Sequence, residues 1–240
     1  MKRPNESPVL VMDALGIASK VASANEFELI SLADKLDDQY HNFKLRLPNS
    51  IVIDTKKNIF GSQEFSSLRM NDMFIVFSQK QLPDFRLRYM VSAAILYQQL
   101  LTLGFIPRGA LGNGLVLQRN DMILGNGFID AYMSAEKRGR HFKDICAVQL
   151  SYNFFKAVDN TEHSYRLLCW YEGRFFLNPI ALKDPDIGDF DRDKVMDCLI
   201  SSGANSQKLR ATEKFLENYE DYDQAMKPES KSRELTGWSP

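Results

Sequence analysis

Two aspartates interrupt or end apolar segments, and they are the residues of this sequence best suited to chemistry. Asp13 follows the run PVLVM at 8–12, and Asp72 lies at the tip of a predicted hairpin, just before the run MFIVF at 73–77. An ionised carboxylate at the end of a buried strand needs water, a cation or hydrogen bonds, because burying it unpaired is costly. Two such carboxylates side by side repel each other unless a cation lies between them. The pair therefore predicts a divalent-metal site, of the kind that usually serves phosphate-bearing ligands.

The elements that must position these carboxylates can be read from the spacing of apolar residues and from turn residues. The predicted elements, in chain order, are a strand at 8–13, a helix at 23–44, a short strand at 50–54, a hairpin at 64–79, a helix at 84–103, strands at 105–117 and 122–124, a helix at 127–138, a strand at 145–150, a hairpin at 164–178 and helical structure at 190–226. Alternation of helices and strands, interrupted by hairpins, predicts an α/β (α+β) fold with one mixed, mainly antiparallel sheet and helices packed on it.

Composition narrows the class of protein. The 240 residues are 25% charged with a formal net charge of −1, so no basic nucleic-acid footprint is present. No apolar run approaches the roughly 20 residues of a membrane span. The three cysteines are isolated, which predicts reduced thiols and a cytoplasmic protein. We expect a main domain at 1–185, a helical extension packed on it at 186–227, and a mobile tail at 228–240.

Several motifs occur in an order that resembles a known family. They are DALG at 13–16, the hairpin with ND at 71–72, RGALGNG at 108–114, and DAY at 130–132 before Glu136. Together they resemble the class III nucleotidyl cyclase catalytic domain, which has a ferredoxin-like core. The match looks closest to the bacterial pyrimidine cyclases of the Pycsar anti-phage defence systems. The resemblance covers roughly residues 8–150.

The resemblance implies an activity and a site. The ribose 3′-hydroxyl of a nucleoside triphosphate would attack the α-phosphate and release pyrophosphate. Two Mg²⁺ or Mn²⁺ ions per site would be held by Asp13 and Asp72, with the Ala14 carbonyl. The expected nucleotide contacts are Ala14, Leu15, Gly16, Ile17, Ala18, Ser19 and Leu68. A head-to-tail homodimer with sites at its interface is also implied, and the cyclic product would act on a separate effector protein.

Two departures from the purine cyclases bear on the substrate. The position of their base-reading Lys is Leu68, which cannot hydrogen-bond a base edge, and this favours a pyrimidine, with UTP ahead of CTP. The Asn and Arg of their helix align with Asp130 and Ser134. A purine cyclase with unusual base contacts, or a cyclase-like pseudoenzyme that binds nucleotide without turnover, remain alternatives.

The cation that would stabilise the transition state must then come from elsewhere. Arg108 is the candidate that we assign a catalytic role, although a strand-end Arg paired with a local carboxylate is an equally good interpretation. Lys137, Arg138 and Arg140 are further candidates, and for them a solvated helix end that complements the helix dipole is the simpler interpretation. The glycines at 109, 112 and 114 either admit a ligand or relieve crowding in a bent strand.

Overall fold

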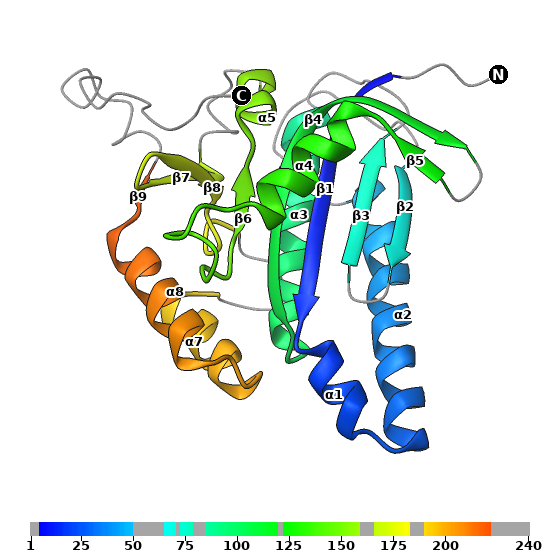
Figure 1. Ribbon diagram of the computed structural model, residues 1–240, viewed down its shortest axis with the longest axis vertical. Coiled ribbons are helices and arrows are strands. Elements are labelled where there is room, and N and C mark those ends of the chain that lie inside the picture. The colour runs from blue at the N-terminus through cyan, green and yellow to red at the C-terminus, as the bar shows by residue number, and fades with distance from the viewer. Residues whose placement is uncertain are drawn as a thin grey trace.

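The computed structural model describes residues 5–49, 65–70, 73–78, 85–119, 122–158, 166–182 and 190–221. Figure 1 shows how the elements are arranged. They are β1 (Asn5–Leu15), α1 (Ile17–Ser23), α2 (Glu26–Asn49), β2 (Phe65–Met70), β3 (Met73–Ser78), α3 (Phe85–Thr102), β4 (Ile106–Arg119), β5 (Met122–Leu124), α4 (Asn126–Glu136), β6 (Val148–Leu150), α5 (Tyr152–Ala157), β7 (Leu168–Tyr171), β8 (Arg174–Leu177), α7 (Arg192–Ser201), α8 (Ser206–Asn218) and β9 (Glu220–Asp221).

One sheet organises the molecule. Its strand order is β2-β3-β1-β4-β6-β8-β7-β9, and β5 pairs with the far part of β4. Among the described strand pairs only β4–β6 is parallel. The mixed, mainly antiparallel α/β sheet predicted from the sequence is therefore confirmed.

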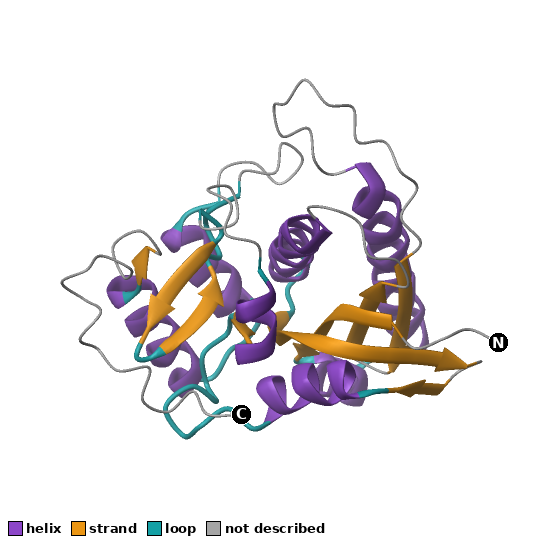
Figure 2. Ribbon diagram, turned by 90° about the horizontal axis from the view of Figure 1, so that it is seen from above, coloured by secondary structure: helices purple, strands orange, loops and turns teal. Residues whose placement is uncertain are grey.

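The central strand β1 is buried on both faces. Leu10 and Met12 belong to the large core shared with α3, whereas Val9 and Val11 belong to a smaller core shared with α4. Successive side chains of a strand point to opposite faces, so an unbroken apolar run is what a doubly covered strand requires. Figure 2 shows α3 and α4 on opposite sides of the strands.

The predicted helix at 23–44 is wrong at its start, because two helices replace it. Gly16 begins α1 with a positive φ of 96°, and the chain breaks again at 24–25 before α2. Asn25 and Glu28 explain the second start. The Asn25 side chain accepts a hydrogen bond from the backbone N–H of Glu28, whose carboxylate accepts one from the backbone N–H of Asn25. This reciprocal capping box begins α2 where periodicity alone predicts continuous helix.

The hairpins are placed as predicted. β2 and β3 pair antiparallel, with residues 71–72 between them, and β7 pairs with β8. Glu172 and Gly173 both have positive φ, at 45° and 86°, which is the conformation of the tight turns that join strands. The segment predicted as a strand at 50–54 lies outside the described residues.

The helical segment predicted at 190–226 is also interrupted. It comprises α7, α8 and the short strand β9, which pairs with β7. Asn205 starts α8 by accepting a hydrogen bond from the backbone N–H of Lys208. Phe215 of α8 is fully buried and contacts Phe176 and Tyr171 of the sheet. Helix α8 therefore packs on the sheet. The predicted division into domains, whose boundary at 185 and tail from 228 lie outside the described residues, stays a prediction.

Within the described part of the chain, no helix has both the length and the hydropathy that crossing a membrane requires.

Candidate functional site

Asp13 lies within β1 and not at its end. The strand continues through Ala14 and Leu15, which pair with Pro107 and Ile106 of β4. Asp13 itself stands opposite Arg108 on β4 and opposite Met73 on β3. Its side chain is 13% exposed. The carboxylate therefore sits between two neighbouring strands, close to the surface, where a charged group can still reach a polar ligand.

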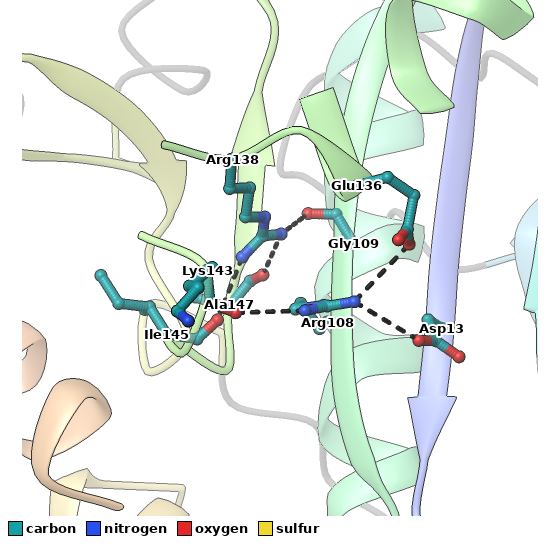
Figure 3. Close-up of polar contacts among 8 residues, drawn as sticks. All are labelled: Asp13, Arg108, Gly109, Glu136, Arg138, Lys143, Ile145 and Ala147. Atoms are coloured by element: carbon teal, nitrogen blue, oxygen red, sulfur yellow. Dashed lines mark hydrogen bonds and ion pairs between the residues drawn. The ribbon is translucent and has the colours of Figure 1, made fainter. Parts of the chain in front are cut away.

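Arg108 lies between two carboxylates, as Figure 3 shows. Its Nη2 atom is 3.7 Å from Asp13 Oδ2 and 3.5 Å from Glu136 Oε1, and its Nη1 donates to the carbonyl of Lys143 at 3.1 Å. Arg108 thus pairs with two carboxylates, which is compatible with either role that the sequence left open for it. The contact with Glu136, at the end of α4, was not predicted, because no local sequence pattern places a helix end beside a strand 28 residues earlier.

The second predicted metal ligand, Asp72, lies outside the described residues, as does Asn71. The described part of the hairpin nevertheless bears on it. β2 ends at Met70 and β3 begins at Met73, and Met73 is the residue that faces Asp13. Leu68 stands opposite Ile75 on the outer strand. Met73, which follows Asp72 in the sequence, is therefore the described residue of this hairpin that lies opposite Asp13.

The predicted phosphate-contact segment forms the end of β1 and the start of α1. Ala14 is fully buried, and Gly16 is the N-cap of α1. Ile17, Ala18 and Ser19 make the first turn, whose backbone N–H groups have no partner within the helix. These groups follow Asp13 directly in the chain, as the sequence predicted, although α1 has only seven residues.

The position of Arg138 differs from the solvated one that the sequence predicted. The sequence placed it in a solvated helix end, but its side chain is 5% exposed. Its guanidinium donates to the carbonyls of Ile145 at 3.0 Å, Ala147 at 2.9 Å, and Gly109 (Figure 3). Burial, and secondarily the charge of Arg108, lowers its pKa to about 9, so it remains charged at neutral pH. The guanidinium is thus used to join β4 to the segment before β6, and it is not available to a phosphate.

The side chains of Lys137 and Arg140, which flank Arg138 in the sequence, are exposed, as expected of a solvated helix end.

Asp130, which aligns with the Asn of the purine cyclases, is used for packing. Its carboxylate accepts hydrogen bonds from the backbone N–H of Asn113 at 3.0 Å, from the Asn153 side chain at 2.9 Å and from the Ser151 hydroxyl. These three donors come from β4 and from the start of α5. Asp130 therefore holds α4 against the sheet and against α5.

The glycines of β4 relieve crowding. A Cβ on Gly109 would lie 2.4 Å from the Val11 carbonyl oxygen, and a Cβ on Gly112 would lie 2.4 Å from the backbone nitrogen of Ala131. Both distances are far shorter than a van der Waals contact. For these two positions, close packing against β1 and α4 is the reason for glycine.

The donors present fit a divalent cation in kind. Carboxylate and carbonyl oxygens are the ligands that Mg²⁺ and Mn²⁺ prefer. The described residues supply the Asp13 carboxylate, while no group of three His, Cys, Asp or Glu side chains among them is placed to hold a metal. The metal site predicted from Asp13 and Asp72 therefore stays a prediction.

Comparisons with known proteins give no family assignment. No family model matches the chain, and no curated protein matches it. Among solved structures, the adenylyl cyclase CyaB from P. aeruginosa is similar with a TM-score of 0.47 and 12% identity, over 73% of this chain and 94% of that one. A class III adenylyl cyclase-like ATP-binding protein from Pseudomonas aeruginosa gives a TM-score of 0.40 and 13% identity, over 89% of this chain and 43% of that one. Similarities this weak assign no activity to the chain.

Proposed function

We propose that this chain is a metal-dependent nucleotidyl cyclase that converts a pyrimidine nucleoside triphosphate, UTP ahead of CTP, to the 3′,5′-cyclic monophosphate. One observation carries the proposal. Asp13 and Arg108 face each other on adjacent strands, with their charged groups 3.7 Å apart, beside Met73, the residue to which Asp72 is covalently joined. A carboxylate for a cation beside a guanidinium for phosphate charge is part of what triphosphate chemistry requires.

The chain's own residues would divide the work as follows. Asp13, the Ala14 carbonyl and Asp72 would hold two Mg²⁺ or Mn²⁺ ions, which when bound lower the pKa of the attacking hydroxyl and offset phosphate charge. Arg108 would turn from Asp13 toward the phosphates and neutralise the charge that develops there. The first-turn N–H groups of α1 would bind phosphate oxygens. A bond forms between the ribose 3′-oxygen and the α-phosphorus, the bond to pyrophosphate breaks, and the hydroxyl proton passes to solvent.

The pyrimidine preference rests on Leu68 and on the sequence resemblance. Leucine has no group that can hydrogen-bond the edge of a base, so the usual device for reading a purine is absent at that position. The resemblance to Pycsar cyclases supports a role in anti-phage defence, in which the cyclic product activates a separate effector.

A head-to-tail homodimer, with catalytic sites at its interface, belongs to the same proposal. Its support is that large apolar side chains are exposed on β5 and on α4. They are Met122, Leu124, Ile129, Tyr132 and Met133. In Figure 1 the β4–β5 arm extends beyond the body of the sheet. We expect the purified protein to have twice the monomer mass by light scattering.

A direct assay tests the activity. The protein is incubated with each of the four nucleoside triphosphates and Mn²⁺, and cyclic product and pyrophosphate are quantified. Turnover of UTP or CTP alone supports the proposal. Turnover of ATP or GTP would instead support a purine cyclase with unusual base contacts.

A nucleotide-binding pseudoenzyme is the second candidate, and a specific observation favours it. Arg108 already provides Asp13 with an opposite charge, which reduces the need for a metal cation there. Binding of nucleotide without product from any of the four triphosphates would support this candidate and overturn the first.

A further inference from the structure

A cleft of about 580 Å³ lies between α1, the N-terminal part of α2 and the corner that joins α3 to β4. Figure 1 shows these elements at the lower end of the molecule. Phe27, Ser31 and Lys35 recur at every fourth residue, so one face of α2 forms a wall of the cleft. The described lining residues include none that we assign to catalysis or nucleotide binding, and the volume suits a small organic ligand.

Two lysines bring positive charge to this cleft from different helices. Lys20 of α1 is partly buried, and its Nζ donates to the Gly104 carbonyl at 2.5 Å and lies 4.8 Å from the centre of the Phe105 ring. Because Phe105 also lines the cleft, the ammonium lies at its wall, and an ammonium has two N–H donors beyond the one that Gly104 accepts. Lys35 lines the cleft from α2 and is exposed.

Neither ammonium has an opposite charge beside it in the described part of the chain, since no carboxylate there forms an ion pair with Lys20 or Lys35. Glu28 is the acid among the described lining residues, and its carboxylate already accepts the backbone N–H of Asn25 in the capping box. Burial, and secondarily the charge of Lys35, lowers the pKa of the Lys20 ammonium. An anion placed between the two lysines relieves their mutual repulsion.

The rest of the wall is largely apolar. Leu32 and Leu103 are partly buried against the main core, and Phe105 is buried beside them. Phe27 lines the cleft with 83% of its surface exposed, so its ring is open to contact with a ligand. Covering such apolar surface is favourable by about 25 cal/mol per Å². A small inorganic anion reaches the lysines but leaves this surface in water.

We infer that this cleft binds an organic carboxylate with an apolar body, either an aliphatic chain or an aromatic ring. The carboxylate lies between Lys20 and Lys35, and the body covers Leu32, Leu103 and the Phe27 ring. The inference does not depend on the proposed cyclase activity.

Isothermal titration calorimetry on the full chain tests the inference. Octanoate and 2-naphthoate are titrated separately, with acetate as the charge without the body and octanamide as the body without the charge. We expect at least one carboxylate to bind at submillimolar concentration, and acetate and octanamide to bind at least about tenfold more weakly. Binding by only one of the two carboxylates identifies the aliphatic or the aromatic class.

Three outcomes of the titrations would overturn the inference. The first is no heat from either carboxylate at millimolar concentration. The second is binding of acetate or octanamide as tight as that of the carboxylates. The third is displacement of the bound carboxylate by an equal concentration of pyrophosphate, which would assign the two lysines to phosphate and leave the proposed cyclase function standing.

Charge variants locate the binding. Lys35→Glu should weaken carboxylate binding at least about tenfold, whereas Arg210→Glu, an equal charge change on an exposed residue of α8, should leave it unchanged. Lys20→Met should also weaken it, with circular dichroism to check the fold. Because Lys35 is exposed, its variant remains informative if Lys20→Met fails to fold. Equal binding by wild type and Lys35→Glu contradicts the inference.

A second pair of variants tests the apolar wall. Phe27→Ala should weaken binding at least about threefold, because the ligand loses the ring that it covers. Ile30→Ala is the matched control, since Ile30 is an exposed apolar residue of the same helix that is not part of the described lining. An equal loss of affinity in both variants would show that the ligand does not lie in this cleft.

Discussion

Arg108 and Asp13 stand opposite each other on β4 and β1, and Arg108 Nη2 lies 3.7 Å from Asp13 Oδ2. The same nitrogen lies 3.5 Å from Glu136 Oε1. A guanidinium that is paired with two carboxylates keeps an opposite charge beside it when one of the two carboxylates binds another cation. The arrangement therefore keeps Arg108 oriented before a ligand arrives, and it allows exchange of partners when phosphate enters.

Asp13→Asn tests the proposed metal ligand. The change keeps the side-chain shape but removes the charge, so we expect turnover in the nucleotide assay to fall at least about 100-fold. The free energy of unfolding should change by about 1 kcal/mol or less, because Arg108 keeps Glu136 as a partner. Glu217→Gln on the exposed face of α8 is the matched control and should retain full activity. Near-normal turnover by Asp13→Asn would rule out the metal assignment.

Arg108→Met tests the proposed stabilisation of the transition state. If Arg108 neutralises charge that develops during the reaction, kcat should fall about 10²–10³-fold, while KM changes much less. Arg119→Met, at the exposed end of the same strand, should leave both constants unchanged. A variant with a raised KM and an unaltered kcat would mean that Arg108 only binds substrate.

Arg138→Met tests the buried guanidinium. The variant removes this donor from the carbonyls of Gly109, Ile145 and Ala147, of which Ala147 keeps the backbone N–H of Gly109 at 3.3 Å. Each buried group that is left unpaired costs about 1–3 kcal/mol. We expect the free energy of unfolding, measured in urea, to fall by roughly 3 kcal/mol or more. Lys137→Met, on the exposed neighbour, should change it by less than about 0.5 kcal/mol. Equal midpoints for the two variants would show that the buried contacts contribute nothing.

Gly112→Ala tests the close approach of α4 to β4. The added Cβ would lie 2.4 Å from the Ala131 nitrogen, so the helix must shift, and overpacking of this kind destabilises by about 1–3 kcal/mol. Gly139→Ala is the matched control, because its Cβ would meet no atom closer than 3.8 Å. Thermal unfolding should separate the two variants clearly. Identical melting temperatures would mean that α4 is not packed as closely as described.

We expect the buried thiol of Cys169 to lower the free energy of unfolding at alkaline pH. Burial, and secondarily the charge of Asp221, raise the pKa of its thiol well above the ordinary value. The unfolded chain therefore ionises first. The full contribution of the neutral thiol to the free energy of unfolding is present below the pKa of the thiol in the unfolded chain, about 8.5. It is lost as the pH rises above that value, by up to about 1.4 kcal/mol per pH unit.

We expect the curve of unfolding free energy against pH to fall less steeply above pH 9 for Cys169→Ala than for wild type. Val148→Ala removes a buried side chain of similar size without an ionisable group, so its curve should run parallel to that of wild type. A Cys169→Ala curve parallel to both would contradict the role of the thiol.

Local sequence patterns were sufficient to predict most of the helices and strands. The helix α3 and the hairpins at 64–79 and 164–178 depend on neighbouring residues, and the sequence predicted each of them. The breaks at 24–25 and at 202–205 were missed, because caps such as Asn25 interrupt a periodic pattern without changing it. The short helix α5 was missed because its six residues are too few to show a period.

The sequence by itself determined which residues carry the candidate chemistry, since Asp13, Arg108 and the turn at Gly16 follow from residue types and their order. Only the tertiary structure decided what these residues contact. Glu136 reaches Arg108 because α4 packs across β4, and Arg138 is buried because carbonyls of β4 and of the segment before β6 converge on it. The register that joins β1 to β4 connects residues about 100 positions apart, and no local pattern encodes a pairing at that separation.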